Sequence, residues 1–246
     1  MIVSLLLLWS FLISGHPSGM DAGDEAFFSI DYPRAFSSYD AALRADAGNP
    51  VLLWRLARVS VCMGEVAADP SRDTLFRAGE RYARLCIKAD SSIPEGHTWL
   101  AGALGYLALD ASAKEQLSLT RELLGEADRA LTLNPSDDVA YSIKGSCYRA
   151  LGNVGWIQRQ IASLLLGSVP PGGFPEAEAA LQKAIALAPR VMRHEYELGV
   201  LYIDWGRREE ARAVLEHAAT LPVQTAIDRP RLEKIKQLLT VLGAAE

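Results

Sequence analysis

The side chains best suited to catalysis or metal binding are few in this chain, and their spacing matches no catalytic motif. His97, His194 and His217 lie far apart in the sequence and share no metal-ligand spacing. The pair His194-Glu195 lacks the second histidine of an H-E-x-x-H zinc motif. A glycine-rich phosphate loop and a G-x-S-x-G nucleophile motif are also missing. We therefore expect no catalytic residue, no metal site and no cofactor.

Three cysteines, Cys62, Cys86 and Cys147, form no C-x-x-C pair, and each is flanked by apolar residues in a helical pattern. Such cysteines usually behave as small buried hydrophobic side chains. The alternative is one disulfide and a free thiol in an oxidising compartment.

One pattern of small and large residues occurs twice near the end of the chain. It indicates helical hairpins, which would position the side chains named above. Small and large residues alternate at fixed offsets, which is typical of a tetratricopeptide repeat, a two-helix unit of about 34 residues. The first copy has Tyr141, Gly145, Tyr148 and Gly152, then Ala177, Leu181 and Ala184. The second has Leu198, Gly199, Tyr202 and Gly206, then Ala211, Leu215 and Ala218.

Earlier segments carry weaker copies of the same pattern. The first-helix aromatic position is taken by Trp54, Trp99 and Tyr141, and in the last copy by Glu195. Further helices are predicted over 51–67 and 72–88, and the start of the chain predicts half a repeat, with a poorly formed helix at 24–30. The amphipathic segment 229–242 reads as a capping helix. The sequence thus predicts an all-α fold, a tetratricopeptide-like α-solenoid of antiparallel helix hairpins with a C-terminal capping helix.

The first of the two copies contains an extra segment at about 153–173, between Gly152 and Ala177. Its apolar residues recur at helical spacing and it ends at Pro170-Pro171-Gly172-Gly173. It is either an extended hairpin helix packed on its neighbour, a flap over the groove or a surface-seeking helix. The residues expected to act in it are Trp156, Ile157, Arg159 and Ile161.

The start of the chain is apolar from Ile2 to Ile13, which is too short to span a membrane comfortably. The run fits the hydrophobic region of a secretory signal, and small residues follow it. We expect residues 1–20 to be a signal peptide or an N-terminal anchor, and residues 21–246 to form the repeat domain. An exported, periplasmic or secreted location follows from this prediction. A buried segment is the remaining alternative.

The net charge of −5 argues against a nucleic-acid partner, which normally requires a basic face.

Three segments together resemble the regulator of microtubule dynamics family. They are W-I-Q-R-Q-I-A-S-L-L-L at 156–166 with the following Pro170-Pro171, A-L-Q-K-A-I-A-L-A-P at 180–189, and W-R-L-A-R at 54–58. The resemblance covers about residues 36–242 and implies a tetratricopeptide-like domain. Animal members are intracellular or membrane-anchored proteins linked to microtubules and organelle contacts. Bacterial-type relatives are usually exported repeat proteins, and this chain looks like such an exported member.

In similar repeats the concave groove is lined by first-helix residues at fixed offsets from the aromatic position. Carried over, these offsets give Arg55, His97, Leu100, Leu104, Ser142, Arg149, Arg193 and Tyr196 as candidate binding residues. The alternative is that many of them are core residues of a tightly wound array. The expected function is a non-catalytic binding scaffold for a protein or peptide partner. The rival function is a carrier of a lipid or other apolar ligand, in which arginines meet an anionic head group.

Overall fold

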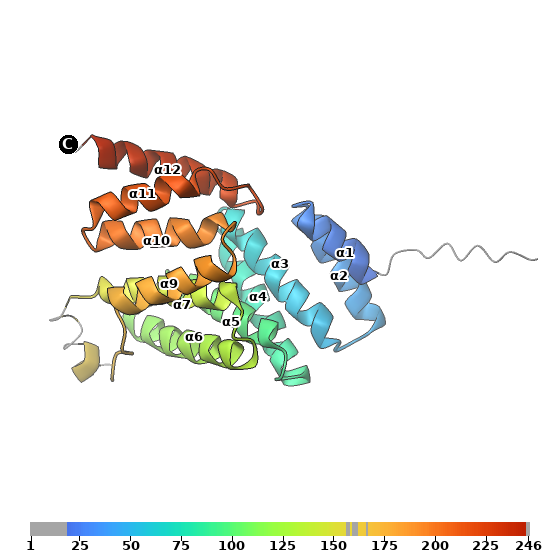
Figure 1. Cartoon of the computed structure of the whole chain (residues 1–246). Helices are drawn as coiled ribbons and strands as arrows, with labels where there is room; N and C mark the ends of the chain where they lie inside the picture. The colour runs from blue at the N-terminus through green and yellow to red at the C-terminus, as the bar shows by residue number, and fades with distance from the viewer. Residues whose placement is uncertain (1–18, 156–157, 159–161, 166, 245–246) are drawn as a thin grey trace, which may run out of the picture.

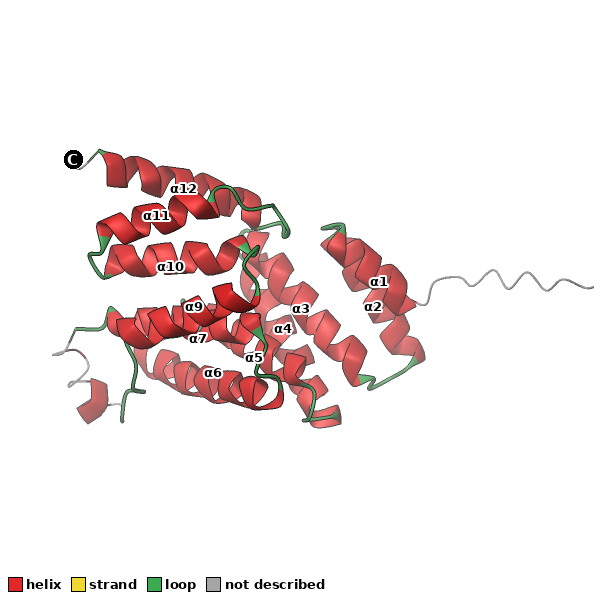
Figure 2. Cartoon of the chain, viewed as in Figure 1, coloured by secondary structure: helices red, strands yellow, loops and turns green. Residues whose placement is uncertain are grey.

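The computed structural model describes residues 19–155, 158, 162–165 and 167–244. None of these residues lies in a β-strand, and helices joined by short loops account for most of them (Figure 2). Antiparallel helix hairpins stack side by side from the N-terminal to the C-terminal end (Figure 1). The predicted all-α solenoid is therefore confirmed.

The hairpins follow one another in chain order. Their helices are α1 (Gly19–Phe28) with α2 (Tyr32–Ala45), α3 (Pro50–Val66) with α4 (Ser71–Ala89), α5 (Pro94–Leu107) with α6 (Ala113–Leu133), α7 (Asp138–Gly152) with α9 (Phe174–Leu187), and α10 (Met192–Asp204) with α11 (Arg208–Ala218), followed by α12 (Asp228–Gly243).

Several of these helices begin at side chains that satisfy free backbone amides. The Asn49 side chain accepts hydrogen bonds from the amides of Val51 and Leu52, and Pro50 occupies the first position of α3. The Asp137 side chain accepts from the amide of Ala140 at the start of α7. These local signals fix where the first helix of each of these two hairpins starts.

Glycines let the two helices of a hairpin approach closely. A Cβ atom on Gly199 would lie 2.5 Å from the Leu215 side chain, and one on Gly145 would lie 2.5 Å from the Leu181 side chain. Gly145 and Gly199 thus lie where the two helices of their hairpins cross. Gly64 packs against Phe76 in the same way between α3 and α4.

The first hairpin is complete, which corrects the expectation of half a repeat with a poorly formed helix at 24–30. The helix α1 runs from Gly19 to Phe28 and packs along α2. Gly23 leaves room for the Tyr39 ring, and the Tyr39 hydroxyl donates to Asp24 at 2.6 Å. Contacts with α2 and α3 stabilise a helix whose own sequence is weakly helical.

The last helix, α12, caps the array as predicted. It packs against α11 and α10, and Ile235 and Leu242 are buried there. Across the described residues, none of the helices combines the length and the apolar character needed to cross a membrane.

Two predicted segments fall mainly outside the described residues. These are residues 1–18 of the expected signal peptide or anchor, and Trp156, Ile157, Arg159 and Ile161 of the inserted segment. Residues 162–165 form a helical turn on which Leu164 and Leu165 are 85% and 72% exposed. Arg121 of α6 donates to the carbonyl of Ser168 at 2.6 Å, which ties the end of the insertion to the array.

We expect Gly199→Leu to lower the free energy of unfolding by about 1–3 kcal/mol, because a side chain there overlaps Leu215. The measurement is urea unfolding followed by circular dichroism. Gly125→Leu is the matched control, since a Cβ on Gly125 of α6 meets no atom within 4 Å. Equal midpoints for Gly199→Leu and the wild type would refute the close approach.

Candidate functional site

The inner face of the solenoid is formed by the first helices α3, α5, α7 and α10, which pack on one another in that order, with α12 against α10. We use "inner face" for the side chains that these helices turn toward each other. In similar repeats this face binds the ligand, so its residues are the first candidates for a site.

A buried ion pair joins the first and last parts of this face. The Glu65 side chain of α3 is 2% exposed and accepts a hydrogen bond at 3.0 Å from the guanidinium of Arg193 on α10. The hydroxyl of Tyr106 on α5 donates to the same Glu65 oxygen at 2.5 Å. The Glu65 carboxylate raises the pKa of Arg193, and burial raises the pKa of Tyr106. Three helices are thus held together at one carboxylate.

A second polar group lies between α7 and α10. Arg149 donates to Asp204 at 2.7 Å and lies 3.7 Å from Glu197. The hydroxyl of Ser146 donates to Glu197 at 3.0 Å, and the amide of Asn153 donates to Asp204 at 2.7 Å. The charges on this part of the inner face are paired within the chain.

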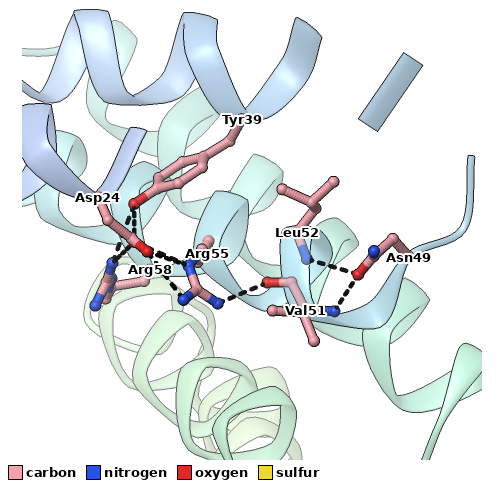
Figure 3. A network of polar contacts seen from close by, with 7 residues as sticks. All are labelled: Asp24, Tyr39, Asn49, Val51, Leu52, Arg55 and Arg58. Carbon is pink, nitrogen blue, oxygen red and sulfur yellow. Dashed lines mark hydrogen bonds and ion pairs between the residues drawn. The ribbon is translucent and has the colours of Figure 1, made fainter. Parts of the chain in front are cut away.

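The N-terminal end of the inner face carries the network drawn in Figure 3. Asp24 of α1 accepts hydrogen bonds from Arg55 of α3 at 2.9 Å and 3.0 Å and from the Tyr39 hydroxyl at 2.6 Å. The guanidinium of Arg58 also lies 3.5 Å from Asp24 and packs 3.6 Å from the centre of the Phe27 ring. Burial raises the pKa of Asp24, but the hydrogen bonds from Arg55 and Tyr39 outweigh it, so the pKa is lower than usual.

The two ends of the array also meet. The amide of Ala226, in the loop before α12, donates to the hydroxyl of Tyr32 at the start of α2 at 3.2 Å. In Figure 1 this loop lies close to the upper end of α3. Together with the Glu65–Arg193 pair, this contact closes the inner face with the chain's own side chains.

Four of the candidate groove residues lie in the interior. Leu100 and Leu104 are 1% and 0% exposed and belong to the main hydrophobic core, and Ser142 is also buried. His97 is buried between Glu126, at 2.5 Å, and the carbonyl of Ser91, at 3.0 Å. For these residues the interpretation as core of a tightly wound array holds, and a ligand could not contact them in this conformation.

The other four candidates lie on the inner face, but the arginines are already paired. Arg55, Arg149 and Arg193 bind Asp24, Asp204 and Glu65, and Tyr196 packs 5.7 Å from the guanidinium of Arg231. Their use in binding a partner stays a prediction. Sequence reasoning missed the acidic partners, because nothing in a helix repeat tells which acid of another helix an arginine will meet.

The histidines and cysteines are engaged in structural contacts. His194 lies 2.8 Å from Asp138, and His217 lies 2.7 Å from both carboxylate oxygens of Glu195. The three cysteines are free thiols, and burial raises the pKa of Cys62 to about 12 and those of Cys86 and Cys147 to about 11. A thiol with so high a pKa is a poor nucleophile near neutral pH. The described part of the chain also brings together no metal-binding cluster of histidine, cysteine and acidic side chains.

Two pockets open between second helices, on the outer side of the solenoid. One, of about 570 Å³, lies between α2 and α4 above Leu53, and its lining includes Asp40, Arg44, Leu85 and Lys88. The other, of about 430 Å³, lies between α9 and α11 above α10. Each occupies the same place in its hairpin, over the first helix and between two successive second helices.

Stacked hairpins with glycine crossings and a capping helix define a tetratricopeptide-like α-solenoid. The fold is similar to a thermophilic TPR protein of Thermus thermophilus, with a TM-score of 0.67, 21% identity, and coverage of 90% of this chain and 97% of that one. It is also similar to yeast Tom70, with a TM-score of 0.54, 18% identity, and coverage of 92% of this chain and 39% of that one.

Comparison of the sequence with known families identifies the family of this chain. Residues 21–243 match the family described as Regulator of microtubule dynamics protein 1-3, and the chain belongs to this family. It is 28% identical over 196 residues to Regulator of microtubule dynamics protein 3 of Xenopus laevis, covering 79% of this chain and 42% of the relative. It is 25% identical over 191 residues to Regulator of microtubule dynamics protein 1 of Bos taurus, covering 76% of this chain and 60% of that relative. The chain thus spans about half the length of these relatives, and the predicted resemblance is confirmed.

Arg193→Met should lower the free energy of unfolding by about 3–5 kcal/mol, because it leaves the Glu65 charge buried without its cation. Arg44→Met is the control. The Arg44 side chain is 79% exposed, so its ion pair with Asp40 should contribute only about 0.2–1 kcal/mol to the free energy of unfolding. Urea unfolding of both variants measures the difference. Adding Glu65→Leu to Arg193→Met should restore part of the loss, and equal effects of the two arginine variants would contradict the buried pair.

Stability should fall at alkaline pH. The pKa of Cys62 is raised from 9.0 to about 12, and those of Tyr32 and Tyr39 from 10.0 to about 12, mainly by burial. The folded state holds these protons more tightly, so their contribution is complete below about pH 9 and is lost as the pH rises toward 12. Urea midpoints at about pH 7, 9 and 10.5 test this. Cys62→Ala should flatten the decline, and a flat profile for the wild type would exclude the effect.

Proposed function

We propose that this chain is a non-catalytic scaffold that binds a protein or peptide partner. The stack of helical hairpins carries the proposal, because such arrays present extended surfaces built from repeated units. Membership in a family named for the regulation of microtubule dynamics supports a regulatory role over a catalytic one. The engaged histidines and high-pKa cysteines support the same reading.

The outer pockets are the surfaces on which we place the partner. The inner face is tied by Glu65–Arg193 and by the pairs around Asp24 and Asp204, so a ligand there would have to break buried ion pairs. The pocket between α2 and α4 has an apolar base at Leu53 and opens to solvent at its rim, where Leu85 is 42% exposed. A partner can bind there without disturbing the fold.

The rival function, a carrier of a lipid or apolar ligand in the inner groove, receives less support. The leucines predicted to line that groove, Leu100 and Leu104, are core residues. The arginines expected to meet an anionic head group are held by acidic side chains. Native mass spectrometry of gently purified protein separates the two functions, since a co-purified small molecule would favour the carrier.

The scaffold is tested by cross-linked capture from the native compartment, followed by calorimetry of the recovered protein with the full chain. Leu85→Glu and Val214→Glu each place a charge in one outer pocket, and we expect one of them to weaken binding at least about tenfold. Leu109→Glu is the matched control, because Leu109 is 63% exposed and lines neither pocket.

Stabilised microtubules are the first partner to test by co-sedimentation, given the names of the relatives. Absence of any saturable protein partner would refute the scaffold. Binding that all three variants retain would place the partner away from the outer pockets.

A further inference from the structure

The last hairpin differs from the one before it at one position. Four residues before the glycine of the helix crossing, α7 has Tyr141 before Gly145, whereas α10 has Glu195 before Gly199. Glu195 thus places a carboxylate where the preceding hairpin has a ring.

The 430 Å³ outer pocket lies at this substitution. We call it the Glu195 socket. Its base is formed by Glu195 and Leu198 of α10, which are 6% and 5% exposed. The remaining lining residues come from α9 and α11 and are Gln182, Ile185, Ala186, Ala213, Val214 and His217. The small side chains Ala186 and Ala213 are exposed at the rim, so the socket opens to solvent.

The carboxylate at the base is incompletely engaged. Its one hydrogen-bond partner among the described residues is Nδ1 of His217, at 2.7 Å from each oxygen. A carboxylate can accept about four hydrogen bonds, and a buried one is costly unless a cation pairs with it. His217 itself is 62% exposed, so its ring can move aside without leaving a core position.

We propose that the Glu195 socket receives a lysine or arginine side chain of the partner polypeptide. The aliphatic walls of Ile185, Leu198 and Val214 suit the methylene stem of such a side chain, and the carboxylate suits its charged head. An uncharged apolar guest would bury the carboxylate further without a cation. The proposal rests on the scaffold function and specifies the chemistry of its partner.

The other outer pocket offers no such preference. Its lining carries one acidic and two basic side chains, Asp40, Arg44 and Lys88, and Asp40 is paired with Arg44. The Glu195 socket is therefore the place where charge selects the partner.

The test uses two small probes with the same stem and different heads, pentylammonium and pentan-1-ol. Two-dimensional NMR of the full chain follows the amide signals of Leu198, Val214 and His217 during titration. We expect saturable shifts with pentylammonium and at least about tenfold weaker binding of pentanol. Glu195→Gln should reduce the affinity for pentylammonium to that for pentanol.

Two further variants separate the socket from general electrostatics and from misfolding. Glu216→Gln removes an exposed charge of α11 that does not line the socket, and it should keep the preference. Glu195→Trp fills the socket with a ring and should block both probes while the melting temperature holds or rises.

Equal binding of the two probes by the wild type would overturn the proposal, as would Glu195→Gln that keeps the preference or Glu216→Gln that loses it. The capture experiment does not depend on the socket. Failure of the proposal for the socket can therefore be distinguished from failure of the proposed scaffold function. A partner captured by the wild type should in addition lose affinity when its basic residues are replaced.

Discussion

The buried pair of Glu65 and Arg193 determines how the rest of the solenoid is arranged. Repeats of this class generally leave an open inner groove, whereas here α3 and α10 are joined across it, 128 residues apart in the sequence. A carboxylate that is 2% exposed needs its cation, so this pair holds α3 and α10 in contact. The charged side chains Arg55, Arg149 and Arg193 of the inner face are then paired within the chain, which is why we propose that a partner binds outside.

Within each hairpin the dominant constraint is close approach. Leu181 and Leu215 occupy the space left by the missing side chains of Gly145 and Gly199, and buried alanines lie along the same seams. Because this geometry repeats, a change at one repeat position has a local effect on its hairpin. Glu195 is such a change: the hairpin keeps its crossing at Gly199 but carries a carboxylate and a pocket where the preceding hairpin has the Tyr141 ring.

The sequence was sufficient for features that depend on neighbours in the same hairpin. The crossings at Gly145 and Gly199 and the cap α12 follow from residues within about 40 positions of each other, and periodicity reports such contacts. Contacts between distant repeats depend on the curvature of the array, which no single repeat encodes. The groove candidates Leu100 and Leu104 are buried, as the alternative interpretation had it, and the acid Glu65, which binds Arg193 at a separation of 128 residues, was missed. The helix α1 was underestimated because its own sequence is weakly helical and its stabilising contacts come from Tyr39 of α2 and Arg55 of α3.

The inner pair and the outer socket lie on one helix. Arg193 and Glu195 are two residues apart in α10, and residues at that spacing point to different sides of a helix. Arg193 binds Glu65 on the inner face while Glu195 forms the base of the socket. The buried pair thus holds α10 against α3, and packing with α9 and α11 holds the socket walls against α10. A site whose walls are fixed before binding loses less conformational entropy when a side chain enters. In the scaffold that we propose, the pairing that closes the inner face therefore also preorganises the outer socket.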